Sequence, residues 1–261
     1  MTVFDPLPAA RALRGMRQDR VPVTRLPVGT APATAGEAAA VQRALADLVG
    51  AVPPAGFKIG ATGKRMQVYL GVDAPVAGFM RAEDVYHGTA DLRFSDFIKP
   101  GVECEVAVRL ARDLPSAPCS FEQALAAVGD FFAGIEIVEN RYGDLRDLGT
   151  PTLLADQMYH AAAVVGDQHD TGWRGLDIGA LRGRISLDDG TGDEGITTDL
   201  LGHPINGLAW LAGSAEAAAF GGLRAGQIVM LGSVTPPVWL QGPATVTVSF
   251  PPLPAVTVRL R

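Results

Sequence analysis

Two glutamates separated by one residue are the first feature of the sequence that could do chemistry. Glu103 and Glu105 lie in residues 102–108, where apolar and polar side chains alternate. Neighbouring side chains of a β-strand point to opposite faces, so both carboxylates share one face, with Cα atoms about 6.6 Å apart. They repel each other unless a cation neutralises them or one stays protonated. The pair therefore indicates a site for Mg²⁺, Mn²⁺ or Ca²⁺, or alternatively a solvated strand face.

A third carboxylate, Glu136, lies in residues 134–138, a run that is otherwise typical of a buried strand. A buried carboxylate is costly unless it is paired, hydrogen-bonded or bound to a metal. Glu139 has the opposite strand phase and a more polar setting, so we favour Glu136 as the third ligand of a cation such as Mg²⁺ or Mn²⁺. The alternative for Glu136 is an ion pair with an arginine such as Arg141.

Lys58 is one of only three lysines in a chain with 22 basic residues, and it lies in the apolar, glycine-flanked residues 56–60. A partly buried lysine shifts its pKa readily, which arginine does not. Lys58 is therefore a candidate for binding a substrate carboxylate or for acid–base chemistry. The alternative is a lysine at a strand edge with its ammonium group in water.

Composition and missing motifs exclude several classes of protein. A formal net charge of −6 argues against nucleic acid as the main partner. We find no apolar run of about 18 residues and no signal peptide, so we expect a cytoplasmic protein that does not span a membrane. The two cysteines suggest neither a disulfide framework nor a zinc site, and Cys104 fits a small core residue. None of the four histidines has metal-ligand spacing, so we expect them to be structural or exposed.

The elements that must carry these residues are mixed. Helical periodicity and capping signals predict helices at 8–17, 38–49, 120–132 and 205–220. Apolar runs predict strands at 56–60, 76–80, 92–98, 102–108, 134–139, 226–232, 244–250 and 255–260, and a polar loop spans 140–156. Helices do not alternate regularly with strands, which favours an α+β fold with a large mixed sheet. We expect a helical region at 1–54 and a catalytic domain at 55–261.

Taken in order, several segments resemble the hydratase/decarboxylase branch of the fumarylacetoacetate hydrolase superfamily. They are residues 56–62, 70–75, 98–105, 112–114, 135–141, 201–204 and 223–226. That branch includes 2-keto-4-pentenoate hydratases and 4-oxalocrotonate decarboxylases. The resemblance implies a mixed β-roll with flanking helices, in a homo-oligomer that can associate with a pathway partner enzyme. It also implies a small 2-oxo acid as substrate.

The resemblance also assigns roles to individual residues. The family's three metal carboxylates match Glu103, Glu105 and Glu136, and its lysine matches Lys58. Its catalytic aspartate matches Asp156. We expect substrate-binding residues at Arg141, Ser233 and Thr235 and a pocket wall at Trp239, with ordinary packing as the alternative for Ser233, Thr235 and Trp239.

Some residues depart from the family pattern. Hydratases tend to carry Asp where Val76 stands, whereas decarboxylases tend to have an aliphatic residue there and a tyrosine in the place of Tyr142. Residues 232–234 resemble the hydratases instead, and Gln157 replaces an expected Asn.

We therefore expect a divalent-metal-dependent lyase, most of all a 2-keto-4-pentenoate hydratase, with a 4-oxalocrotonate-type decarboxylase as the alternative. The cation would hold the substrate's carboxylate and 2-oxo oxygens and stabilise the negative charge that develops there. Lys58 would position or protonate the substrate, and Asp156 would orient the substrate or a water. An acylpyruvate C–C hydrolase or a non-catalytic partner subunit are further alternatives.

Overall fold

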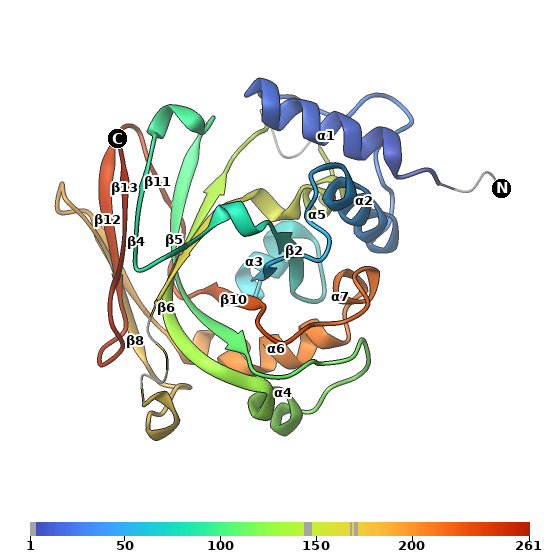
Figure 1. The fold of residues 1–261 in the computed structure, drawn as a ribbon. Coiled ribbons are helices and arrows are strands. Elements are labelled where there is room, and N and C mark those ends of the chain that lie inside the picture. Colours follow the sequence, from blue (N-terminus) through green and yellow to red (C-terminus); the bar gives the residue numbers. More distant parts are fainter. Residues whose placement is uncertain (1–3, 144–147, 168, 170–171) are drawn as a thin grey trace.

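The computed structural model describes residues 4–143, 148–167, 169 and 172–261 (Figure 1). Its α-helices are α1 (Leu7–Asp19), α2 (Ala35–Leu48), α3 (Lys64–Leu70), α4 (Phe121–Ala127), α5 (Thr150–Ala155), α6 (Pro204–Ala212) and α7 (Ala215–Ala219). The first strands are β1 (Gly56–Gly60), β2 (Val76–Met80), β3 (Val85–His87), β4 (Thr89–Leu92), β5 (Pro100–Leu110), β6 (Val128–Glu139) and β7 (His160–Val165). They are followed by β8 (Arg182–Leu187), β9 (Gly192–Ile196), β10 (Ile228–Ser233), β11 (Val238–Trp239), β12 (Ala244–Ser249) and β13 (Val256–Leu260).

The larger sheet is built around the long antiparallel pair β5 and β6. Its strand order is β2-β1-β10-β5-β6-β7-β3, and β11 pairs with β5 off this path. β1 pairs with β10 in parallel, whereas β5 pairs antiparallel with both of its neighbours. The mixed pairing and the separate helices confirm the predicted α+β fold.

A second sheet, in the order β4-β13-β12-β8-β9, packs against one face of β5 and β6. That face carries the apolar half of the β5 alternation, including Val102, Cys104 and Val106, and all three side chains are fully buried. Figure 1 shows the second sheet on the left and the helices on the other side of β5 and β6. The period-2 pattern therefore directs the glutamates of β5 away from the inter-sheet core.

Helices α1 and α2 cover the edge of the structure near β2 (Figure 1). Thr34 caps α2 by accepting a hydrogen bond from the Glu37 backbone N–H, as the capping signal predicts. The Glu37 carboxylate accepts from Ala33 instead of from the cap residue. Apolar residues of both helices belong to the same core as the sheets, while the predicted division at residues 54 and 55 stays a prediction.

The strand predicted at 92–98 and the end of the helix predicted at 120–132 were wrong. Residues 92–98 do not form a strand, because β4 ends at Leu92 and Phe94–Asp96 forms a 3-10 turn in which Arg93 pairs with Asp96. The helix that begins after Ser120 has its predicted capping box but ends at Ala127, not at Phe132. Residues from Val128 onward pair with β5 instead, because long-range pairing of β-branched and aromatic residues overrides the helical periodicity.

Two further segments also differ from expectation. The loop predicted at 140–156 contains α5, which has a proline in its first turn, where a missing N–H costs nothing. The helix predicted at 205–220 is divided into α6 and α7, because Ser214 caps a new helix by accepting from the Ala217 N–H. Among the helices of the described residues, none is both long and apolar enough to cross a bilayer.

Candidate metal and active site

Three carboxylates meet on the face of β5 and β6 that is turned away from the second sheet. Glu103 lies directly opposite Glu136 in the antiparallel register, and Glu105 is two residues farther along β5. One ligand atom from each of the three residues lies within 4.8 Å of the others. Glu105 and Glu136 are buried, while Glu103 is partly exposed. Three oxygen donors at this spacing form a set suited to a hard divalent cation.

An irregularity in β10 supplies a partner for Glu105. The register between β10 and β5 shifts between Met230 and Ser233. The Gly232 backbone N–H there donates to Glu105 Oε2 over 3.0 Å. Gly232 has a φ of +108°, and a Cβ at this position would lie 2.6 Å from Thr62 Oγ1. Only glycine fits this backbone, so the bulge and the amide that holds Glu105 depend on it.

Lys58 and His160 both contact Glu136. Lys58 Nζ lies 3.3 Å from Glu136 Oε1, and His160 Nδ1 lies 2.9 Å from the same atom. Because Glu136 is a charged acceptor, Nδ1 is the imidazole nitrogen that carries the proton. The second oxygen, Glu136 Oε2, is buried and has no hydrogen-bond partner among the described residues. An orphaned carboxylate oxygen beside two further carboxylates fits a bound cation.

The protonation of the three carboxylates reflects this crowding. Burial, and then repulsion from Glu136, raises the pKa of Glu103 to about 8. Burial, and then the charges of Glu136 and Glu103, raises the pKa of Glu105 well above its usual value. Burial alone would also raise the pKa of Glu136, but the Lys58 ammonium and the hydrogen bond from His160 hold it below its usual value. One ammonium cannot neutralise three carboxylates, so the remaining charge is balanced either by protons on Glu103 and Glu105 or, with all three carboxylates ionised, by a divalent cation.

A cavity of 360 Å³ adjoins the cluster. Its polar lining includes Lys58, Glu103, Asn140 and Tyr159. Its apolar lining comes from Ala61, Met66, Leu70, Val138, Met158, Pro237 and Trp239. A second cavity of 430 Å³ shares Asn140 and Trp239 with it, so Trp239 stands between the two. The site has the size and the mixed lining of a small-molecule pocket.

Comparison with known proteins gives the family. A family model described as Fumarylacetoacetate (FAA) hydrolase C-terminal matches residues 58–261. The chain belongs to the fumarylacetoacetate hydrolase family.

Relatives of this family member include a 2-keto-4-pentenoate hydratase of Paraburkholderia phymatum, 32% identical over 192 residues that cover 74% of this chain and 72% of that protein. A 2-oxo-hept-4-ene-1,7-dioate hydratase of Escherichia coli is 29% identical over 194 residues, 70% of each chain. A 4-oxalocrotonate decarboxylase of Pseudomonas putida G7, complexed with magnesium and adipate, has the same fold. Its TM-score is 0.89 at 21% identity, covering 100% of this chain and 99% of that one.

Ser233 and Thr235, which were expected to bind substrate, lie near the carboxylates. Neither of them is among the described residues that line the cavity. Ser233 Oγ is 3.2 Å from the Cys104 carbonyl oxygen and 2.8 Å from that of Thr235, so it holds the bulged backbone together. Thr235 is buried. Trp239, for which ordinary packing was the alternative, is a cavity wall.

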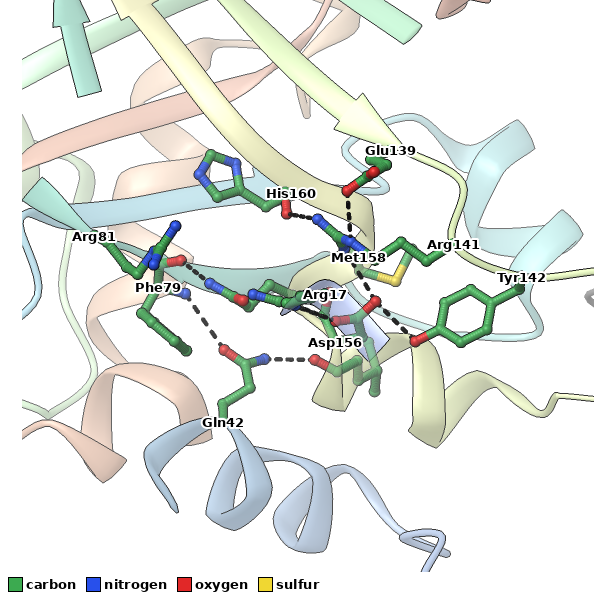
Figure 2. Close-up of polar contacts among 12 residues, drawn as sticks. Arg17, Gln42, Phe79, Arg81, Glu139, Arg141, Tyr142, Asp156, Met158 and His160 are labelled. Atoms are coloured by element: carbon green, nitrogen blue, oxygen red, sulfur yellow. Dashed lines mark hydrogen bonds and ion pairs between the residues drawn. The ribbon is translucent and has the colours of Figure 1, made fainter. Parts of the chain in front are cut away.

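Asp156 and Arg141 also lie outside the cavity lining, in a buried polar cluster (Figure 2). Asp156 accepts hydrogen bonds from Arg17, Arg141 and Tyr142. Arg141 pairs with Glu139 and Asp156, so it is not the partner of Glu136. Burial alone would raise the pKa of Asp156, but Arg141 and Arg17 hold it below its usual value.

Sequence reasoning missed several residues of the site. His160 was expected to be structural or exposed, yet it is the hydrogen-bond partner of Glu136. Asn140 and Tyr159 line the cavity, and Arg17 reaches Asp156 from the distant helix α1. A histidine at the head of the apolar residues 160–165 was the one available signal, since a buried imidazole needs a polar partner.

Proposed function

We propose that this protein is a divalent-metal-dependent lyase for small 2-oxo or 2-hydroxydienoic acids, and that it hydrates a 2-hydroxypenta-2,4-dienoate-like compound. The observation that carries the proposal is the cluster of Glu103, Glu105 and Glu136 beside the cavity, with the buried Glu136 Oε2 lacking a partner among the described residues. The hydratase relatives at about one-third identity support the reaction class.

The three glutamates would hold Mg²⁺ or Mn²⁺. When bound, such a cation supplies Lewis-acid stabilisation of negative charge on a substrate oxygen. The solved relatives complexed with magnesium, calcium or manganese support a divalent cation.

Lys58 is suited to hold the substrate beside the three glutamates. Its ammonium group has three N–H donors. One donates to the Met158 carbonyl oxygen over 2.8 Å, and another faces Glu136. The described residues offer the third N–H no further acceptor, so it can donate to a substrate oxygen, and Lys58 can orient a 2-oxo acid or deliver a proton to it.

The apolar wall is suited to the hydrocarbon part of such a substrate. Met66, Leu70, Val138 and Pro237 line the same cavity as the charged groups. Apolar walls exclude water from the chain of the substrate and strengthen the polar contacts of its acid end.

A 4-oxalocrotonate-type decarboxylase is the second candidate. Val76 is buried on β2, directly opposite the cavity residue Gly60. An aliphatic residue there, together with Tyr142, matches the pattern expected of decarboxylases. Both reactions develop negative charge on the same 2-oxo oxygen, so the carboxylate cluster serves either one.

The hydrolase alternative has less support. A water-activating histidine would have to face the substrate. His160 contacts Glu136 but is buried, and it is not among the described residues that line the cavity. The non-catalytic subunit has less support too, because all three carboxylates are present. The homo-oligomer and the complex with a pathway partner enzyme stay predictions.

The experiment is turnover of enzymatically generated 2-hydroxypenta-2,4-dienoate and of 4-oxalocrotonate with Mg²⁺ or Mn²⁺. Native protein is compared with EDTA-treated protein, with Glu103→Gln, and with the surface control Glu194→Gln. Metal-dependent loss of the dienoate supports the hydratase, and CO₂ release from oxalocrotonate supports the decarboxylase. Absence of both reactions in a metal-loaded protein would rule out the proposed substrates.

A further inference from the structure

The segment that follows Asp156 has an unusual backbone. Gln157, Met158 and Tyr159 have φ angles of +57°, +48° and +68°, so three successive residues other than glycine are in the left-handed region. A Cβ atom crowds the backbone in this conformation, so such residues persist only where their surroundings hold them. We call Gln157–Tyr159 the left-handed turn.

The left-handed turn forms part of the cavity. Its Met158 carbonyl oxygen accepts the hydrogen bond from Lys58 Nζ, and Met158 and Tyr159 both line the cavity. The Tyr159 ring makes an edge contact with Trp239, the wall shared by the two cavities. A change in the turn would therefore move the ammonium group of Lys58 and the cavity wall together.

The two ends of the left-handed turn are tied to each other through Arg141. Arg141 NH1 donates to Asp156 Oδ2 over 3.0 Å on the side before the turn. Arg141 NH2 donates to the His160 carbonyl oxygen over 2.6 Å on the side after it. Figure 2 shows the Arg141 guanidinium between these two groups, with Glu139 on its Nε.

Helix α1 completes this cluster from a distant part of the chain. Arg17 Nε donates to Asp156 Oδ1 over 2.9 Å, and its NH2 contacts the same oxygen. The Tyr142 hydroxyl donates to Asp156 Oδ2 over 2.7 Å. Arg17 and Arg141 balance the charges of Asp156 and Glu139, which allows the group to be buried. Asp156 is fully buried, so its carboxylate is committed to the protein and not to substrate.

We propose that Arg17, Arg141 and Asp156 form a clamp that fixes the left-handed turn, and thereby positions Lys58 for catalysis. The three act as positioning residues, through the Met158 carbonyl group. Helix α1 is then part of the catalytic apparatus. The activity arm of the test rests on the proposed function, whereas the conformational arm does not.

The test compares Arg17→Met, Asp156→Asn and the double variant with a matched control, Arg20→Met. Arg20 also joins the end of α1 to the body of the protein, through Asp96, but at the surface. Each Mg²⁺-loaded protein carries ¹³C-methyl methionine. The Met158 signal, one of six, is identified by its loss in Met158→Leu. The readouts are kcat, KM, Mn²⁺ affinity and the chemical shift of the Met158 methyl group.

Arg17→Met and Asp156→Asn should each lower kcat about 10- to 100-fold, because small misplacements of a positioned group have effects of this size. Both should shift the Met158 signal and weaken Mn²⁺ affinity less than Glu103→Gln does, because they displace Lys58, which supports the ligand Glu136, and remove no ligand. The kcat of the double variant should fall no further than that of the more impaired single variant, because both changes release the same turn. Arg20→Met should match native protein in all four readouts.

The proposal is overturned if Arg17→Met has the same kcat as Arg20→Met, or if the Met158 signal does not move. It is also overturned if the fall in kcat of the double variant equals the product of the two single falls. Should Arg17→Met fail to fold, Tyr142→Phe takes its place, because it removes one hydrogen bond from Asp156 and keeps the ring. If native protein turns over neither substrate, the proposed function fails, and the Met158 signal alone then decides whether the clamp fixes the turn.

Discussion

Glu103 on β5 and Glu136 on β6 are directly opposite each other, and a ligand atom from each lies within 4.8 Å of one from Glu105. Opposed carboxylates destabilise a strand pair unless a cation lies between them or one of them is protonated. The stability of the protein therefore depends on metal binding and on the protonation of these carboxylates, which links metal affinity, pH and stability.

Replacing one ligand should weaken metal binding strongly. Glu103→Gln keeps the shape of the side chain but removes its charge. Groups that only support a metal ligand already contribute about 10- to 100-fold in affinity, so we expect a loss of about 100-fold or more for Mn²⁺. Mn²⁺ titration followed by electron paramagnetic resonance measures the change. The exposed Glu194→Gln, which loses a surface pair with Arg184, should bind as native protein does. Equal affinity of native and Glu103→Gln protein would exclude Glu103 as a ligand.

Metal-free protein should lose stability as the pH rises. Burial and Glu136 raise the pKa of Glu103 from 4.5 to about 8. Between these values the folded state binds more protons than the unfolded state, so the free energy of unfolding falls with rising pH. The stabilising contribution is complete below pH 4.5 and is lost above pH 8.

Thermal denaturation in EDTA at pH 5.5 and 8.5 measures this dependence. We expect the lower Tm at pH 8.5, a smaller difference in Glu103→Gln, and a larger gain in Tm from Mg²⁺ at pH 8.5. A metal-free Tm that rises over this range would contradict the protonation of Glu103.

Trp239 should contribute to substrate binding more than to folding. It lines both cavities and is 42% exposed. Trp239→Ala removes part of the apolar wall, so we expect KM to rise about three- to tenfold, which corresponds to the loss of a partly buried apolar contact. Steady-state kinetics measures it, with Val28→Ala as a control because Val28 is 95% exposed. An unchanged KM would mean that substrate does not reach Trp239.

Gly78 should be intolerant of substitution. A Cβ on Gly78 would lie 2.7 Å from the Cβ of Gln157 and 2.9 Å from its Cα, so the left-handed turn packs directly on β2. Gly78→Ala should lower the free energy of unfolding by about 1–3 kcal/mol, as overpacking does. Urea denaturation measures it.

Gly15→Ala in α1 is the matched control for Gly78→Ala. A Cβ there meets no atom within 4 Å. Because alanine favours a helix interior, it should raise stability by about 0.5–1 kcal/mol. If Gly78→Ala leaves the free energy of unfolding unchanged, the left-handed turn can move away from β2 with little loss of stability.

The sequence predicted those features that depend on local periodicity. Glu103 and Glu105 share a face because side chains alternate along any strand. Ser120 caps a helix because its hydroxyl reaches a backbone N–H three residues later. Glu136 could be singled out because a carboxylate in an apolar strand needs a partner.

The end of α4 could not be predicted in this way. The alanine-rich residues up to Ala127 favour a helix, and Gly129 by itself does not show whether the helix ends there, because a single glycine is tolerated within a helix. β6 begins at Val128 because it pairs along nearly the whole length of β5, and this pairing involves residues far apart in the chain.

Sequence alone therefore determined which residue types could hold a divalent cation, which of them lie on the same strand face, and that the fold is α+β. Only the tertiary structure decided that Glu103 faces Glu136, that His160 supports Glu136, and that Asp156 is committed to Arg17 and Arg141 instead of the cavity. The physical reason is the distance along the chain over which each interaction acts. Strand periodicity and capping act over a few residues, whereas register and ion pairing depend on segments that only the packed core brings together.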